Sequence, residues 1–172
     1  MSKKALVIQY LKGIQKLYKE SNNGIIAARF YKWLLKRGKV RKTKRLTKKE
    51  LAELKQILRE SGIQPQAKQC FYVSQMLYLT APDKLKYIEG FANHIIPTEH
   101  AWLEYKGKVV DVVWGCLEHN KSPDKFSADP DCEYFGIEIP LDVITKSISD
   151  TGQAMSLVQQ LFMKECNING KI

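Results

Sequence analysis

Two strand-like runs joined by a glycine turn constrain this chain more than any other part of its sequence. The first run is His-Ala-Trp-Leu-Glu-Tyr at 100–105, and the second is Lys-Val-Val-Asp-Val-Val-Trp at 108–114. Lys106-Gly107 lies between them, and glycine readily adopts the positive φ that a tight hairpin turn needs. We therefore expect an antiparallel pair of strands at this point in the fold.

The register of this hairpin determines which of its side chains share a face. If Tyr105 pairs with Lys108, then Asp111 lies opposite Trp102, and His100 and Asp111 become diagonal neighbours on one face. Diagonal neighbours are about 7–8 Å apart along the backbone, which two polar side chains can span. The sequence thus predicts a carboxylate beside an imidazole.

Elsewhere the sequence alternates helix-like and strand-like patterns, which predicts an α+β fold. Apolar residues recur at spacings of three or four in the helical segments and alternate in the strands. A capping box at Thr47-Lys-Lys-Glu50 begins one helix, and Gly62 ends it. Further helices are expected over 3–20, 25–37, 71–80, 140–148 and 151–166, further strands over 86–92 and 133–139, and a mobile loop over the basic stretch 39–49.

Cys70 comes at the beginning of a predicted helix. This helix ends before Pro82, because a proline cannot continue it. Unpaired amide groups and the dipole of a helix N-terminus favour the thiolate form of a cysteine. A cysteine, a histidine and an aspartate are the groups that thiol catalysis requires. The histidine takes the thiol proton and the carboxylate orients the histidine. We therefore predict that Cys70, His100 and Asp111 form a catalytic triad.

Four segments together resemble the transglutaminase-like branch of the papain-like cysteine hydrolases. They are Cys70 at its helix start, Tyr-Ile-Glu-Gly-Phe-Ala at 87–92, His-Ala-Trp at 100–102 and Val-Asp-Val-Val-Trp at 110–114. The resemblance covers about residues 62–115 and implies a cysteine-bearing helix packed on an antiparallel sheet. It implies a nucleophile at Cys70, a base at His100 and an orienting acid at Asp111. The expected reaction is acyl transfer from a protein or peptide-like amide, with no cofactor and no metal.

The resemblance also suggests which groups stabilise an oxyanion. Gln64 precedes Cys70 by six residues, the offset of the oxyanion glutamine in papain-like peptidases. Its side-chain amide would act together with the backbone N–H of Cys70. Gln66 and Gln69 compete for the same role, so the choice among the three glutamines stays open.

Trp102 and Trp114, close to the predicted acid and base, are candidates for contacts with the substrate. The chain departs from the family pattern at two positions. Val112 follows the aspartate where relatives often carry proline, and Phe71 replaces the usual tryptophan beside the nucleophile. Both departures leave the catalytic atoms in place but allow an altered substrate or a decayed site.

Charge divides the chain into two parts. Residues 1–60 hold 18 lysines and arginines against 4 acidic residues, whereas the remainder holds 10 against 14 and no arginine. We therefore expect a basic helical N-terminal extension over 1–61 and a catalytic core over 62–172. The extension would contact an acidic protein or a nucleic acid through its densest basic stretch, which contains Lys39, Arg41, Lys42, Lys44 and Arg45. In the alternative function the triad is a relic, and the chain is a binding module without enzymatic activity.

The cysteines offer a rival chemistry. Cys116-x-x-His119 with Cys132 has part of a zinc-ligand pattern, which Asp129 or Asp131 could complete, but a second close pair is missing. The four cysteines are irregularly spaced, which is typical of free thiols in a reducing compartment.

The apolar runs are all short. None approaches the roughly 18 residues that a membrane span needs, and the stretch 5–9 is too short for a signal peptide. The sequence therefore predicts a cytoplasmic protein that does not contact a membrane.

Overall fold

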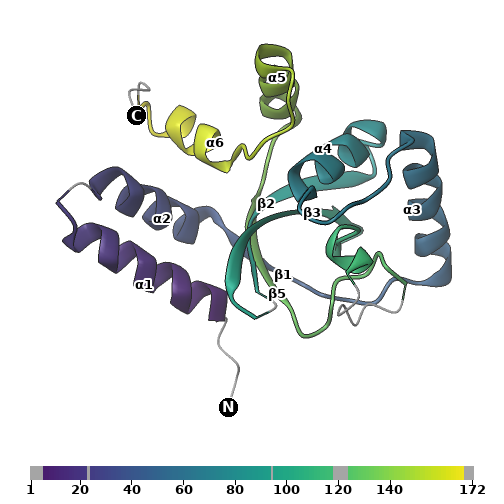
Figure 1. Ribbon diagram of the computed structural model, residues 1–172, viewed down its shortest axis with the longest axis horizontal. Helices are drawn as coiled ribbons and strands as arrows, with labels where there is room; N and C mark the ends of the chain where they lie inside the picture. Colours follow the sequence, from purple (N-terminus) through teal and green to yellow (C-terminus); the bar gives the residue numbers. More distant parts are fainter. Residues whose placement is uncertain (1–5, 23, 94, 118–123, 169–172) are drawn as a thin grey trace.

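The computed structural model describes residues 6–22, 24–93, 95–117 and 124–168, and in these ranges the chain is α+β, as expected (Figure 1). Most of its helices and strands end within three residues of their predicted positions. The helices are α1 (Leu6–Glu20), α2 (Ile25–Arg37), α3 (Lys48–Ser61), α4 (Cys70–Thr80), α5 (Leu141–Thr151), α6 (Val158–Glu165) and the short 3-10 helix η1 (Trp114–Cys116). The strands are β1 (Lys39–Arg41), β2 (Leu85–Asn93), β3 (Pro97–Tyr105), β4 (Lys108–Val110) and β5 (Glu133–Glu138).

The five strands form one antiparallel sheet in the order β1-β5-β2-β3-β4. The sheet curls, and its two edges meet where the backbone N–H of Val109 donates a hydrogen bond of 3.2 Å to the carbonyl of Lys42. None of the helices in the described ranges is both long and apolar enough to cross a lipid bilayer.

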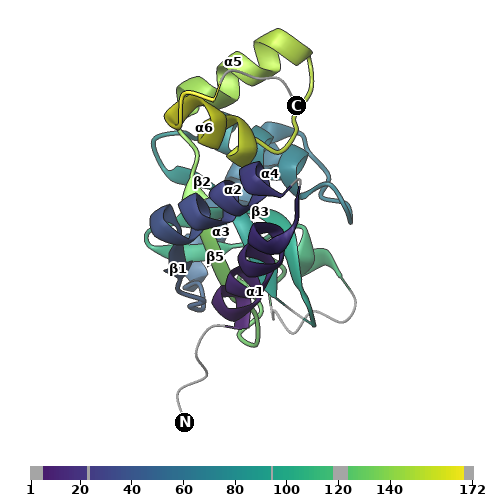
Figure 2. The same ribbon diagram turned by 90° about the vertical axis from the view of Figure 1, so that its left-hand side faces the viewer.

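Apolar side chains fill both faces of the curled sheet. The larger core lies between the sheet and the helices, with α1 and α2 on one side and α3 and α4 on the other (Figures 1 and 2). A second, smaller cluster lies inside the curl around Ile88, Trp102, Val109 and Tyr134. His100 precedes Trp102 by two residues on β3, so its side chain points to this inner face.

The basic stretch 39–49 is not entirely a loop. Its first three residues form β1, in which Lys39 pairs with Gly136 and Arg41 with Tyr134 of β5. The expectation of a loop is wrong there because an edge strand pairs through its backbone whatever its charge, and the side chain of Lys39 remains exposed. The capping box of α3 is confirmed, since Thr47 and Glu50 each accept a hydrogen bond from the backbone N–H of the other.

The expected division between residues 61 and 62 does not coincide with a boundary in packing. Strand β1 belongs to the same sheet as β2 to β5. The larger core joins Leu11 and Leu34 from the N-terminal helices to Phe162 near the other end of the chain. Residues before and after the division therefore share one sheet and one core.

The predicted hairpin register is confirmed at its turn, where Tyr105 pairs with Lys108, but β4 ends at Val110. The expected pairing of Asp111 with Trp102 is therefore wrong. The cause is local, because the Asp111 carboxylate accepts a hydrogen bond of 3.0 Å from the backbone N–H of Trp114. Such a side-chain bond competes with the sheet and turns the chain into a helical bend.

The closing helix predicted over 151–166 is also shorter than expected. Helix α5 ends at Thr151, and Gly152 caps it with a φ of +68°, the left-handed conformation that terminates many helices. Helix α6 begins only at Val158, where the buried Glu89 carboxylate accepts hydrogen bonds from the backbone N–H groups of Leu157 and Val158. A capping group on a distant strand therefore decides where α6 begins.

Gly136 of β5 pairs with Gly90 of β2, and this close pairing of two glycines can be tested by substitution. A Cβ atom at this position would lie 2.4 Å from the carbonyl oxygen of Glu89 and 2.7 Å from the Trp102 ring. We expect Gly136→Ala to lower the free energy of unfolding by about 3 kcal/mol, since overpacking displaces backbone and indole together. Urea unfolding measures the change. Gly13→Ala is the control, because nothing lies within 4 Å of that helical glycine and alanine favours a helix. Equal stability of the Gly136→Ala and wild-type proteins would contradict the close approach.

Candidate active site

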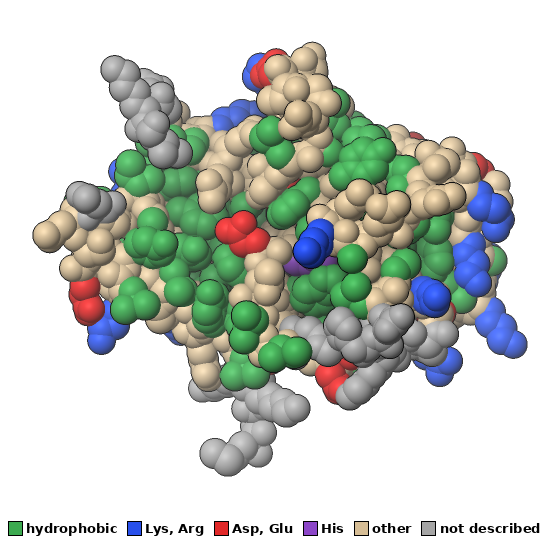
Figure 3. Space-filling view, viewed as in Figure 1, with side chains coloured by type: hydrophobic (Ala, Val, Ile, Leu, Met, Phe, Trp, Pro, Cys, Tyr) green, Lys and Arg blue, Asp and Glu red, His purple; other side chains and the backbone are tan. Residues whose placement is uncertain are grey.

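Cys70 lies at the first residue of α4, in a cleft of about 440 Å³. Its side chain is largely buried, with a residue exposure of 8%. On the face of the molecule in Figure 3, the one histidine among the described residues is visible between hydrophobic and basic side chains. The cleft is lined by the α4 start and the segments around β3 and η1, namely Ala67, Lys68, Cys70, Phe71, Thr98, Glu99, His100, Val113, Trp114 and Leu117.

His100 and Asp111 form a buried pair beside this thiol. The Nε2 atom of His100 lies 2.6 Å from Oδ2 of Asp111, and both side chains are almost inaccessible to solvent. Asp111 reaches the imidazole from the bend after β4 rather than from a paired strand. The expected proximity of His100 and Asp111 is therefore present, although Asp111 lies in a bend and not in a paired strand.

The Asp111 carboxylate is held by two further donors. The hydroxyl of Tyr134 donates to Oδ2 at 2.9 Å, and the backbone N–H of Trp114 donates to Oδ1 at 3.0 Å. Tyr134 is fully buried on β5. Sequence reasoning missed this tyrosine, because it belongs to a strand far along the chain and carries no local motif. These bonds fix the carboxylate oxygen that faces the imidazole.

Two tryptophan rings lie roughly parallel to the imidazole ring of His100. Trp114 stacks on His100 with ring centroids 4.2 Å apart and an interplanar angle of 21°. The ring centroid of Trp102 lies 6.2 Å from that of His100, with an interplanar angle of 22°. Trp102 is fully buried and packs edge-on against Tyr134. An aromatic face attracts a cation, so this stacking favours a protonated imidazole. The sequence placed both residues as substrate contacts. Trp114 lines the cleft, whereas Trp102 lies inside the sheet.

The surroundings of His100 act on its pKa in opposite directions. Burial lowers the pKa of His100, but the charge and hydrogen bond of Asp111, together with the hydrogen bond and charge of Cys70, raise it to about 9. Since Nε2 is committed to Asp111, the remaining ring nitrogen, Nδ1, is the one available to the thiol. The arrangement therefore suits a protonated imidazole near neutral pH.

The three candidate oxyanion glutamines lie outside the interior of the cleft. All of Gln64, Gln66 and Gln69 are exposed, and none belongs to the cleft lining. The side-chain amide of Gln69 donates to Oε1 of Gln66 at 3.4 Å. Backbone N–H groups in the first turn of a helix have no acceptor within that helix. The backbone N–H of Cys70, at the first residue of α4, is therefore the candidate donor to an oxyanion.

Two other cysteines, Cys132 and Cys116, differ from Cys70 in their surroundings. Cys132 is buried, and burial followed by the charges of Asp129, Asp111 and Asp131 raises its pKa to about 12. Partial burial also raises the pKa of Cys116, although this residue is exposed overall. Neither thiol has an imidazole beside it among the described side chains. Both favour the protonated form.

The zinc pattern can be followed only in part. His119, its predicted histidine ligand, lies outside the described residues. Within the described ranges, histidine, cysteine, aspartate and glutamate side chains form no group of three or more that could hold a metal ion.

The basic stretch predicted to contact a partner divides into two sets of side chains. Lys39, Lys42, Lys44 and Arg45 are exposed. Arg41 instead forms an ion pair of 3.0 Å with Glu104, and both side chains are largely buried. Four of the five predicted contact residues are therefore available to a partner at the surface.

Comparisons of the chain with models of protein families, with curated proteins and with solved structures found no match.

Proposed function

We propose that this protein is a cysteine-dependent acyl-transfer enzyme of the transglutaminase-like, papain-like type. Cys70 is its nucleophile, His100 its acid and base, and Asp111 the carboxylate that orients His100. The substrate is an amide or thioester carbonyl of a protein or peptide. The resemblance in residues 62–115 and the contacts among the three side chains support this assignment.

The reaction begins from the ion pair of thiolate and imidazolium. The Sγ atom of Cys70 attacks the substrate carbonyl carbon, and the carbonyl oxygen takes the negative charge near the backbone N–H of Cys70. The carbon–nitrogen bond of the amide then breaks. His100 gives its proton to the leaving nitrogen, which departs as an amine, and a thioester to Cys70 remains.

A second nucleophile resolves the thioester. Water yields a carboxylic acid, and a primary amine yields a new amide. In either case His100 takes the proton of the attacking group, the carbon–sulfur bond breaks, and the thiolate is restored. Peptidases, deamidases and transglutaminases share these steps and differ in which nitrogen leaves and which nucleophile enters.

One observation carries the proposal: the buried contact of 2.6 Å between His100 and Asp111, in a ring environment that also includes the Cys70 thiol. A buried carboxylate held by Tyr134 and by a backbone N–H keeps its charge directed at the imidazole. A histidine that only stabilised the fold would need neither a nucleophile beside it nor a cleft above it.

The proposal is tested by the pH dependence of cysteine alkylation in the wild-type protein. At about pH 6, an ordinary thiol is ionised to well under one part in a hundred and reacts slowly with iodoacetamide. We expect Cys70 to react at least about tenfold faster than the more exposed Cys116, because an imidazolium stabilises its thiolate. Peptide mapping by mass spectrometry identifies the labelled residue.

Cys116 and Cys132 serve as internal controls in the same sample. Cys116 reports an accessible thiol with no imidazole partner among the described residues, and Cys132 reports loss of the fold, because it is buried in the folded chain. Slow labelling of Cys70, parallel to that of Cys116 over the whole pH range, would favour the alternative, a binding module with a relic triad.

A further inference from the structure

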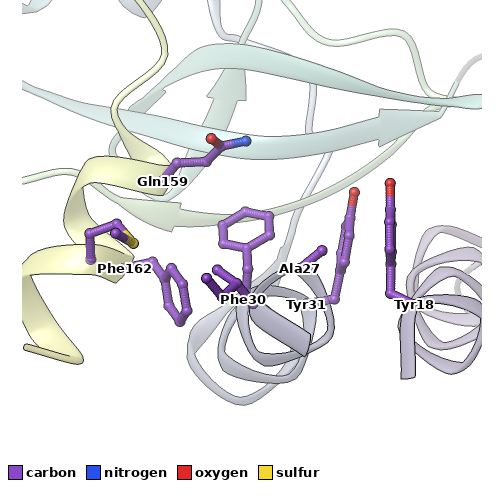
Figure 4. Close-up of a pocket in the computed structure, with 8 residues that line it drawn as sticks. Tyr18, Ala27, Phe30, Tyr31, Gln159 and Phe162 are labelled. Carbon is purple, nitrogen blue, oxygen red and sulfur yellow. The ribbon is translucent and has the colours of Figure 1, made fainter. Parts of the chain in front are cut away.

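Helices α1, α2 and α6 enclose a second cavity, of about 360 Å³, which we term the aromatic groove. Cavities of this size accommodate a large side chain or a small ligand. Its lining is mainly apolar, and Figure 4 shows its rings standing side by side between the helices. The residues that define it here are Tyr18, Ile26, Phe30, Tyr31, Gln159 and Phe162.

The rings of the aromatic groove are held in place by one another. Tyr18 and Tyr31 stack with centroids 5.8 Å apart and an interplanar angle of 12°. Phe30 and Phe162 meet edge-on at 5.5 Å. Because the rings pack against one another, an incoming side chain meets a formed surface and orders little of it on binding.

The rim of the groove is apolar and open to solvent. Tyr18 is 41% exposed and Ile26 is 43% exposed. Leu17, which precedes Tyr18 in α1, is 65% exposed. Clustered exposed apolar side chains around a cavity are typical of an interaction surface.

The aromatic groove is connected to the thiol cleft through Glu99. Glu99 lines the cleft and is paired across the sheet with Phe91, whose ring lies 6.3 Å from the ring of Tyr31. Burial raises the pKa of Tyr31 to about 12, and the charge of Glu99 adds to this shift. Figure 3 shows hydrophobic side chains extending over this face, with acidic and basic side chains beside the histidine. Neighbouring side chains of β3, β2 and α2 therefore link the two sites.

The charge around the groove favours an acidic ligand. Residues 6–37, which form α1 and α2, carry seven lysines and arginines and one glutamate. Most of these basic side chains are exposed, among them Lys16, Lys19 and Arg29. Opposite charges attract an acidic segment and accelerate its association.

We infer that the aromatic groove binds a large apolar side chain of an acidic polypeptide substrate whose reacting amide lies in the Cys70 cleft. That this polypeptide is a substrate rests on the proposed function. That an acidic polypeptide docks here rests on the groove itself. It adds a second recognition site, supplied by the N-terminal helices, to the catalytic cleft.

Fluorescence anisotropy tests the groove without relying on turnover. The probe is a fluorescein-labelled short peptide of glutamates and glycines with one central tryptophan, measured with the full-length Cys70→Ala protein. Replacing the peptide's tryptophan by alanine, or its glutamates by lysines, is expected to weaken binding by about tenfold or more. In the protein, Ile26→Glu is expected to weaken binding of the tryptophan peptide by about tenfold.

Ile25→Glu is the matched control. Ile25 is adjacent in α2, is more exposed and does not line the groove, so the substitution makes the same change of charge outside the site. We expect it to change the affinity by less than about threefold. Both variants replace exposed side chains, and circular dichroism verifies their fold.

The outcomes separate the groove from the active site. If the peptide does not bind, or if Ile26→Glu and Ile25→Glu have equal effects, the inference that the groove binds an acidic polypeptide is overturned. A uridine oligonucleotide that binds more tightly than the acidic peptide and loses affinity in Ile26→Glu assigns the groove to nucleic acid and also overturns the inference. Selective loss of peptide affinity in Ile26→Glu supports the groove, even if the wild-type labelling experiment removes the proposed function.

Discussion

Asp111→Asn is expected to slow the alkylation of Cys70 by about 100-fold at about pH 6. In the wild-type protein, burial lowers the pKa of His100, and the Asp111 charge and hydrogen bond are the main groups that raise it. Without that charge, burial dominates and the imidazole becomes neutral. An asparagine amide also donates toward Nε2, so the ring proton moves to Nδ1, the nitrogen needed to accept the thiol proton.

Stopped-flow or quenched alkylation with iodoacetamide measures this change, with Cys116 as the internal reference. Tyr134→Phe is the matched variant, because it removes one hydrogen bond to Asp111 and keeps the carboxylate charge. We expect it to slow labelling by less than about tenfold and to move the pH profile of labelling, which a purely structural role would not do. His100→Ala should match Asp111→Asn. A rate for Asp111→Asn equal to that of the wild type would remove Asp111 from the triad.

The second large effect is expected from Glu89, a fully buried carboxylate that faces the start of α6. Burial raises the pKa of Glu89 to about 7, against hydrogen bonds from Tyr87, Leu157, Val158 and Ser156 that lower it. In the unfolded chain a glutamate titrates near its ordinary value of about 4.3. Between these two values the folded protein binds more protons than the unfolded chain. Its free energy of unfolding therefore falls as the pH rises.

The expected loss is about 3 kcal/mol on going from about pH 4.5 to above pH 7. Urea unfolding at both ends of this range measures it. Glu89→Gln should flatten the dependence, because the amide does not titrate. Should Glu89→Gln fold poorly, the carboxyl carbon of Glu89 in the wild-type protein can be titrated by NMR, with an expected midpoint of about 7. Stability that rises over this range, or a midpoint near 4.3, contradicts the argument.

The sequence predicted the elements of the fold whose signals are local. The capping box at Thr47 and Glu50 is a pattern of four residues, and the turn at Lys106-Gly107 is a pattern of two. Both formed as expected because their hydrogen bonds join near neighbours. The start of α6 was missed, because it depends on Glu89, a capping group from another strand.

For the candidate site, the approach of His100 to Asp111 was predicted, but from a hairpin whose strand pairing was expected to continue beyond Val110, where β4 ends. The sequence did not show that the carboxylate bonds to the Trp114 backbone and ends β4. Nor did it indicate Tyr134, since a tyrosine in an alternating strand reads as a core residue. The Tyr134 contact joins residues that come together only in the folded sheet, whereas the bond from the Trp114 backbone is local and carries no recognisable sequence pattern.

The pairing of β1 with β5 has a consequence for the order in which the chain can fold. Lys39 meets Gly136 in this pairing, so more than half of the chain length separates the two partners. Trp33 and Arg37 of α2 likewise bond to Glu165 of α6. During synthesis β1 therefore remains without its partner, and the first two helices remain only partly covered, until β5 and α6 have been made. Chains shortened before residue 133 lose this partner entirely, and their N-terminal helices become the segment most prone to aggregate.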